Sequence, residues 1–114
     1  MSQPKSMRLY LAQRLTAALM VPLIVGHLAV MFYATRKGLT AADILGRTRG
    51  SMLWGGYYSL FVIAASIHGS IGLRTVAAEW LSVREPALDR LMWCVGLGLA
   101  LLGLRAVAAV VMAP

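Results

Sequence analysis

Three apolar runs occupy most of this chain, and each is long enough to cross a lipid bilayer as one helix. They span about residues 9–34, 52–76 and 87–112, and a membrane-spanning helix needs about 20 residues. The segments between them, residues 35–51 and 77–86, are too short to fold independently. The sequence therefore predicts an all-α integral membrane domain over residues 1–114, a three-helix bundle that runs up, down and up.

Composition and charge agree with this prediction. The chain is 60% hydrophobic and 13% charged, with a mean hydropathy of +0.75, which lies outside the range of an ordinary soluble domain. The net charge of +7 would suggest nucleic acid in a soluble chain. Here, however, the basic residues lie mainly at helix ends, where they serve the membrane interface and set orientation, so we expect no nucleic-acid partner.

The distribution of basic residues also predicts how the helices are oriented. The first run is too long for the apolar region of a signal peptide and lacks a small-residue cleavage site after it, so we expect it to be retained as a helix. A small excess of positive charge favours a cytoplasmic N terminus in a bacterial inner membrane. The residues inside would then be Lys5, Arg8, Arg14, Arg74, Arg84 and Arg90, and those outside Arg36, Lys37, Arg47 and Arg49.

Local signals predict where the elements begin. Thr40 followed by Asp43 resembles a capping box that opens a short surface helix over about residues 41–47. Pro86 suits the first turn of the third long helix. The single cysteine, Cys94, excludes an internal disulfide, and we expect it to be a small buried side chain.

The two histidines, His27 and His68, both fall within apolar runs. An ionisable side chain in the membrane is a candidate for function. Each lies about 24 Å from the start of its helix, but the two helices run in opposite directions, so the imidazoles should differ in height by about 13–18 Å. The sequence thus places His27 in the outer half of the bilayer and His68 in the inner half.

This separation decides how the two histidines could bind haem. Two axial ligands of one iron lie about 4 Å apart, because each bond is about 2 Å long. If both histidines bind haem, there must be two haems, each completed by a ligand from another chain. Small neighbours such as Gly26, Gly69 and Gly72 leave room for a porphyrin, although tight helix packing, or a hydrogen bond from a histidine to a residue such as Ser66, would also explain them.

Three arginines are candidates for pairing with haem propionates, because guanidinium is the usual partner of a carboxylate where water is scarce. Arg74 lies about 9 Å beyond His68 toward the inner face, and Arg14 lies at the same level on the first helix. Arg105 lies near the expected height of His27 on the third helix. For Arg105, extension of the side chain to the outer interface is the simpler alternative.

Two short motifs resemble a known family. The run Gln13-Arg14-Leu15-Thr16-Ala17, followed by Gly26-His27, resembles the first helix of the membrane anchors of succinate dehydrogenases and fumarate reductases. The run from His68 to Arg74, followed by Glu79-Trp80, resembles the second helix of their cytochrome b subunit. The resemblance covers most of residues 8–90.

The resemblance implies an electron-transfer subunit that does not itself carry out dicarboxylate chemistry. Such a subunit anchors a flavoprotein and an iron-sulfur subunit to the membrane and exchanges electrons with quinone. In two-haem members with two anchor chains, His27 would be an axial iron ligand of the distal haem b and His68 of the proximal one. The resemblance also suggests a quinone site near the inner face, formed by Arg14, Thr16, Glu79 and Trp80.

Two alternatives remain open within this family: an anchor with one haem on His68, and a haem-free structural subunit. One-haem members usually carry a histidine where this chain has Thr75, and His-Arg where it has Gln13-Arg14. A small transporter is disfavoured because all four acidic residues fall in loops or at helix ends.

Overall fold

The computed structural model describes residues 3–113 as four helices. The long helices are α1 (Gln3–Lys37), α3 (Met52–Trp80) and α4 (Ala87–Val111), and the short helix α2 (Ala41–Thr48) lies in the first loop. All three long helices are long and apolar enough to cross a membrane. The chain is therefore an all-helical, multi-pass membrane protein, as the sequence predicted.

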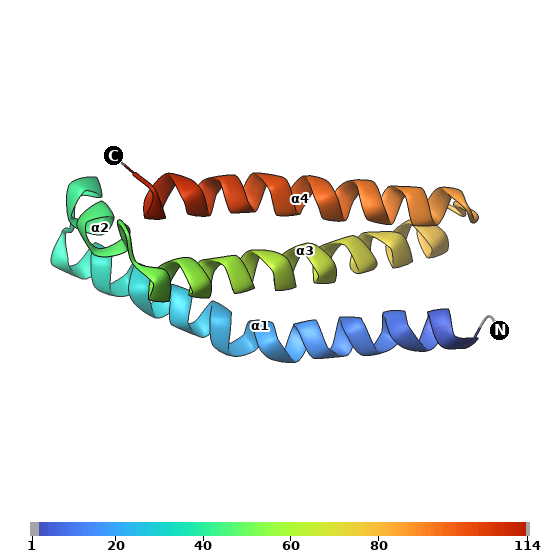
Figure 1. Ribbon diagram of the computed structural model, residues 1–114. Coiled ribbons are helices and arrows are strands. Elements are labelled where there is room, and N and C mark those ends of the chain that lie inside the picture. Colours follow the sequence, from blue (N-terminus) through green and yellow to red (C-terminus); the bar gives the residue numbers. More distant parts are fainter. Residues whose placement is uncertain (1–2, 114) are drawn as a thin grey trace.

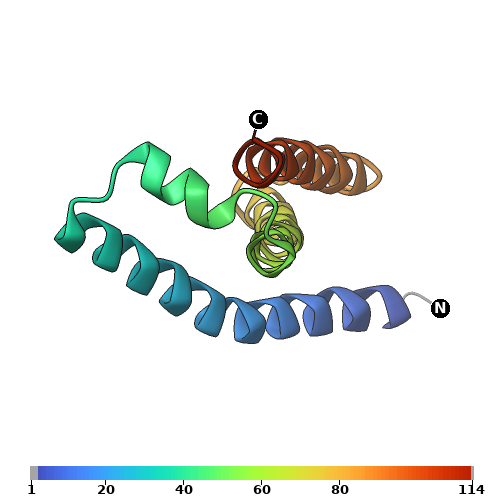
Figure 2. The same cartoon turned by 60° about the vertical axis from the view of Figure 1, so that its left-hand side comes forward.

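The three long helices lie side by side with α3 in the middle (Figure 1). Helix α3 packs extensively against α4 and also against α1, whereas α1 and α4 make little contact with each other. Figure 2 shows α2 leaving the end of α1 and crossing toward the end of α4. We call the end that holds the start of α1 and the α3–α4 loop the N-terminal end, and the opposite end the α2 end.

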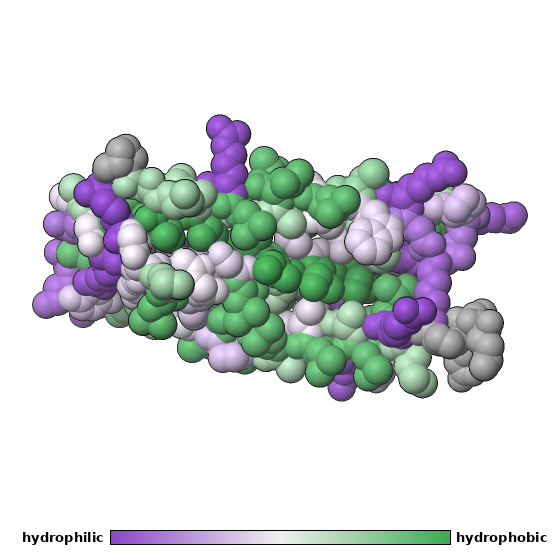
Figure 3. Space-filling model, viewed as in Figure 1, coloured by the Kyte–Doolittle hydropathy of each residue, from purple (hydrophilic) through white to green (hydrophobic). Residues whose placement is uncertain are grey.

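Two of the long helices, α1 and α3, are longer than the apolar runs that predict them, whereas α4 matches its run to within one residue. The first begins at Gln3 rather than near residue 9, and the second continues to Trp80. A helix satisfies its own backbone hydrogen bonds, so it can continue past the hydrocarbon region into the polar interface. The domain is 51 Å long, compared with about 30 Å for a hydrocarbon core, and its visible surface is apolar in the middle and polar at both ends (Figure 3).

Helix α1 bends near its middle (Figure 1). Pro22 lies within the helix at this point, and a proline has no N–H to donate to the carbonyl four residues earlier. The hydroxyl of Tyr57 on α3 donates to the carbonyl of Leu23, and Gly26 allows the tyrosine to lie against the backbone of α1, since a Cβ there would be only 2.6 Å from the hydroxyl oxygen. The bend and this contact set the half of α1 that carries His27 against α3.

The predicted start of α2 is confirmed. The Thr40 side chain accepts a hydrogen bond from the Asp43 N–H at 3.2 Å, and the Asp43 carboxylate accepts one from the Thr40 N–H at 2.9 Å. Hydrogen bonding from the Thr40 backbone, and to a smaller extent from the Thr40 side chain, lowers the pKa of the Asp43 carboxyl group. At its other end, α2 is joined to α4 because Thr48 donates to the carbonyl of Val110 at 2.8 Å.

Two further expectations can be compared with the structure. Pro86 immediately precedes α4 as its N-cap residue, one position before the first turn. Cys94 was expected to be buried, and this was wrong: its side chain is exposed on α4. The residue faces away from α3, where a lipid or another subunit can cover it.

Candidate functional site

The two histidines lie in different surroundings at different levels of the domain. His68 on α3 faces Thr16 of α1, with the threonine Oγ1 3.3 Å from the imidazole Nδ1. Thr16 precedes His27 by eleven residues on the same helix, which corresponds to about 16 Å. His27 in turn contacts Tyr58 and Phe61, which precede His68 by ten and seven residues on α3, or about 10–15 Å.

Both counts place the imidazoles much farther apart than the roughly 4 Å that separates two ligands of one metal atom. One iron therefore cannot bind both histidines of the same chain. The apolar run lengths and the side-chain contacts on two separate helices thus both separate the imidazoles by far more than one iron can bridge.

His27 lies at the edge of an apolar cavity of about 390 Å³ near the α2 end. Its ring meets those of Tyr58 and Phe61 edge to face, at centroid distances of 5.8 and 5.7 Å. Other walls come from α2 and from α4 at Gly103, Ala106 and neighbouring residues. Nδ1 of His27 is buried and has no hydrogen-bond partner among the described residues.

His68 has a polar environment at the interface between α1 and α3. Thr16 is buried, and its hydroxyl also contacts the carbonyls of Ala12 at 2.7 Å and Gln13 at 3.2 Å. Ser66, which the sequence suggested as a possible partner of a histidine, instead donates to the carbonyl of Val62. The partner of His68 therefore comes from another helix, 52 residues away in sequence.

A small polar cavity lies about one turn from His68 toward the N-terminal end. It has a volume of about 300 Å³ and lies between α1 and α3, lined by Ser6, Leu9, Tyr10, Gln13, Ile71, Arg74 and Thr75. Oε1 of Gln13 is buried without a partner among the described residues. Sequence reasoning noted Gln13 only as part of a motif; an uncharged amide in an apolar helix is a weak signal that could have marked it as a site residue.

Arg74 is held by two carboxylates. Its guanidinium pairs with Glu85 and with Asp89, at 3.3 Å for the latter, and Lys5 of α1 pairs with the same two residues. We call these four residues the ion cluster. The Arg74 side chain is only 16% exposed, so it lies at the edge of the small polar cavity with its charge already balanced within the chain.

The remaining predicted residues are more exposed. Arg14 stacks over Tyr10 at 5.8 Å and is exposed. Arg105 is exposed and lies at the level of His27, because Gly103 and Ala106 on either side of it line the same cavity.

The four residues suggested for a quinone site are not brought together. Thr16 lies opposite His68, whereas Glu79 follows His68 by eleven residues, or about 16 Å along α3. Trp80 is 78% exposed at the end of that helix.

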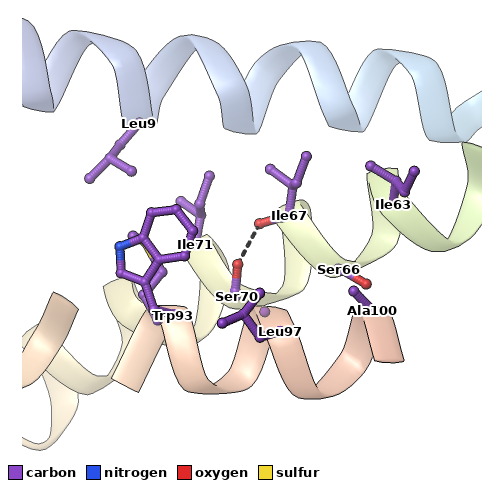
Figure 4. Close-up of a pocket in the computed structure, with 11 residues that line it drawn as sticks. Leu9, Ile63, Ser66, Ile67, Ser70, Ile71, Trp93, Leu97 and Ala100 are labelled. Atoms are coloured by element: carbon purple, nitrogen blue, oxygen red, sulfur yellow. Dashed lines mark hydrogen bonds between the residues drawn. The ribbon is translucent and has the colours of Figure 1, made fainter. Parts of the chain in front are cut away.

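An apolar groove of about 330 Å³ runs between α1 and α4 over one face of α3. Figure 4 shows Leu9 on one side, Trp93 and Leu97 on the other, and Ile67 and Ile71 at its floor. The hydroxyls of Ser66 and Ser70 in its wall both donate to carbonyls of their own helix. Its surface is therefore apolar, and neither histidine is among its lining residues.

A family model described as the succinate dehydrogenase/fumarate reductase transmembrane subunit matches residues 1–113, a range that includes both histidines and the ion cluster. No curated protein and no solved structure matches the chain.

Proposed function

The chain belongs to the family of succinate dehydrogenase/fumarate reductase transmembrane subunits, and on this premise we propose that it is the haem b-binding membrane anchor of a succinate:quinone oxidoreductase. It would carry electrons between an iron-sulfur subunit and quinone. A flavoprotein subunit would carry out the dicarboxylate chemistry, and a second anchor chain would complete both haem sites in a bacterial inner membrane.

The observation that carries this proposal is the placing of the two imidazoles at levels about 10–16 Å apart. His27 and His68 would each occupy one axial position of a different haem b. A haem with two histidine ligands transfers single electrons rather than binding oxygen. Two such sites at different depths form a path for electrons across the membrane.

The described residues fit such groups. At His27, Nδ1 is buried, so Nε2 is the ring nitrogen that can reach the apolar cavity. The volume of this cavity, about 390 Å³, is within the range of cofactor pockets. One side of the cavity is open, so that a second chain can complete it. At His68, the small polar cavity beside Arg74 is lined by Gln13, whose NH2 group can donate to a propionate.

Roles for the remaining candidates follow from their positions. Arg105 would pair with a propionate at the level of His27, and Arg74 would do so near His68 while keeping its contacts with the ion cluster. Glu79 and Trp80, adjacent at the end of α3, are our candidates for contact with quinone at the N-terminal end, which would be cytoplasmic.

The test is a reduced-minus-oxidised spectrum of the purified complex, with the haem content measured per protein. We expect two haems b, loss of one with His27→Ala and loss of the other with His68→Ala. Cys94→Ala, which changes an exposed side chain on α4, is the control and should keep both. Loss of both haems from either single variant would contradict independent sites.

The same measurement distinguishes the alternatives. A one-haem anchor is favoured by one observation, namely that the edge-to-face contacts of His27 could serve packing alone. In that case only His68→Ala removes haem. A haem-free structural subunit would show no haem signal that depends on either histidine.

A further inference from the structure

We infer that Thr16 is a positioning residue for His68, holding the imidazole in the tautomer that leaves Nε2 free to bind a metal. This inference rests on the proposed function only in its second part, the binding of haem iron. Its first part, the hydrogen bond and the tautomer, concerns the chain alone.

The argument begins with the single proton of the Thr16 hydroxyl. Oγ1 lies 2.7 Å from the carbonyl oxygen of Ala12 and 3.2 Å from that of Gln13. An approach of 2.7 Å between two oxygens is stable only when a proton lies between them, and a threonine in a helix commonly donates to the carbonyl four residues earlier. The hydroxyl proton is therefore used within α1.

The contact with His68 must then run in the opposite direction. Oγ1 keeps its lone pairs after donating, so at 3.3 Å it accepts a hydrogen bond from the imidazole Nδ1–H. In a neutral imidazole with Nδ1 protonated, Nε2 carries the free lone pair. Nε2 is thus the ring nitrogen that is available to bind iron.

This arrangement has a consequence for any iron bound there. An acceptor behind a metal-binding histidine fixes the ring orientation and makes the ligand more basic. A more basic ligand stabilises the oxidised metal, so loss of the acceptor should raise the midpoint potential of the haem on His68. His27 has no such acceptor among the described residues, so the haem on His27 should not respond.

The first experiment examines the complete chain without haem. The chain is labelled with 15N-histidine and placed in detergent micelles. Long-range 1H–15N spectra then report which ring nitrogen of each histidine carries the proton. We expect His68 to be protonated at Nδ1 in the natural chain and in Thr16→Ser, and to lose this preference in Thr16→Val, which keeps the shape of the side chain. Protonation of His68 at Nε2 in the natural chain would overturn the inference, even if the valine variant fails to fold.

The second experiment measures the potentials of the haems in the purified complex. We expect Thr16→Val to shift one haem upward, Thr16→Ser to restore its potential, and Thr35→Val, which removes an exposed hydroxyl that donates to its own helix, to shift neither. Two haems with unchanged potentials in Thr16→Val would refute the positioning role. Absence of haem together with the expected tautomer would instead refute the proposed function and leave the hydrogen bond established.

Discussion

The surroundings of His68 and His27 differ in how they hold an imidazole ring. His68 contacts the hydroxyl of Thr16 on a neighbouring helix, and the ion cluster lies at the same end of the domain. His27 lies among aromatic rings beside a cavity, with Nδ1 unpartnered in the described part of the chain. The first ring is oriented by a hydrogen bond and the second by shape alone.

This difference indicates which of the two imidazole rings already has a hydrogen-bond partner within the chain. A buried imidazole nitrogen without a partner costs about 1–3 kcal/mol. A partner subunit or a bound molecule that supplies a hydrogen-bonding group to His27 would recover this free energy, whereas His68 gains nothing comparable. Completing the site at His27 should therefore stabilise the α2 end of the domain, whereas at the N-terminal end the unpartnered buried atom is Oε1 of Gln13 and not a nitrogen of His68.

The largest expected effect is the loss of stability when a methyl group is added at Gly103, beside the His27 cavity, compared with Gly96, which faces Ser70. A Cβ at Gly103, which lines the His27 cavity, would overlap the methyl groups of Val62, and overpacking of this kind costs about 1–3 kcal/mol. At Gly96 a Cβ would meet Ser70 at 3.2 Å, so Gly96→Ala should cost less. We expect Gly103→Ala to lower the thermal stability in micelles more than Gly96→Ala does.

Gly98→Ala is the matched control, since a Cβ there meets nothing within 4 Å. It should leave stability unchanged or raise it by up to about 1 kcal/mol, because alanine favours a helix more than glycine does. Equal losses at all three glycines would show that the α2 end is no more tightly packed than the rest of α4.

The next effect concerns the contact that sets α1 against α3 near His27. Tyr57→Phe removes the hydrogen bond to the Leu23 carbonyl and should cost about 1 kcal/mol in the free energy of unfolding. Tyr10→Phe, which alters an exposed tyrosine at the other end, is the control. If Tyr57→Phe instead changes only the haem assigned to His68, then the conclusion that His27 and His68 have separate surroundings is incorrect.

A smaller effect is expected at the N-terminal end. Arg74→Gln removes one cation from the ion cluster and should lower the melting temperature by a few degrees at low salt. The loss should shrink at high salt, because the screening length falls from about 10 Å at 0.1 M to about 3 Å at 1 M. Arg90→Gln, which changes an exposed arginine of α4 at the same end, should have little effect at either salt concentration.

The smallest effect is a local response of α2 to acid. The pKa of Asp43 in the folded chain lies below its ordinary value of 3.8, so its contribution to the capping box is present above that value and is lost as the pH falls through the lowered pKa. Hydrogen exchange at the amides of α2, which covers the His27 cavity, should become faster in this range. Asp43→Asn should abolish the pH dependence, and equal acceleration near His68 would contradict a local effect.

The sequence predicts the fold well because its signals are local. Run length determines three spanning helices, and the spacing of Thr40 and Asp43 determines the start of α2. Helix ends were less well predicted, since Trp80 and its neighbours are helical although they lie beyond the apolar run.

The site was predicted only in part, because it depends on how the helices are rotated. The apolar residues of helix α1 are not confined to one face, so hydropathy cannot indicate that Thr16 faces His68. The pairing of Arg74 with Glu85 and Asp89 depends likewise on the path of the α3–α4 loop. The levels of the two histidines, in contrast, follow from counting residues along each helix.

The ion cluster has a practical consequence for handling this protein. Lys5, in the first turn of α1, pairs with two carboxylates that lie in and just before the first turn of α4. A purification tag or fluorescent fusion joined to the N terminus would lie only a few residues from Lys5. It would crowd the contacts between Lys5 and the two carboxylates. Such an extension should be separated from Lys5 by a flexible spacer before spectra of the tagged complex are compared with those of the natural one.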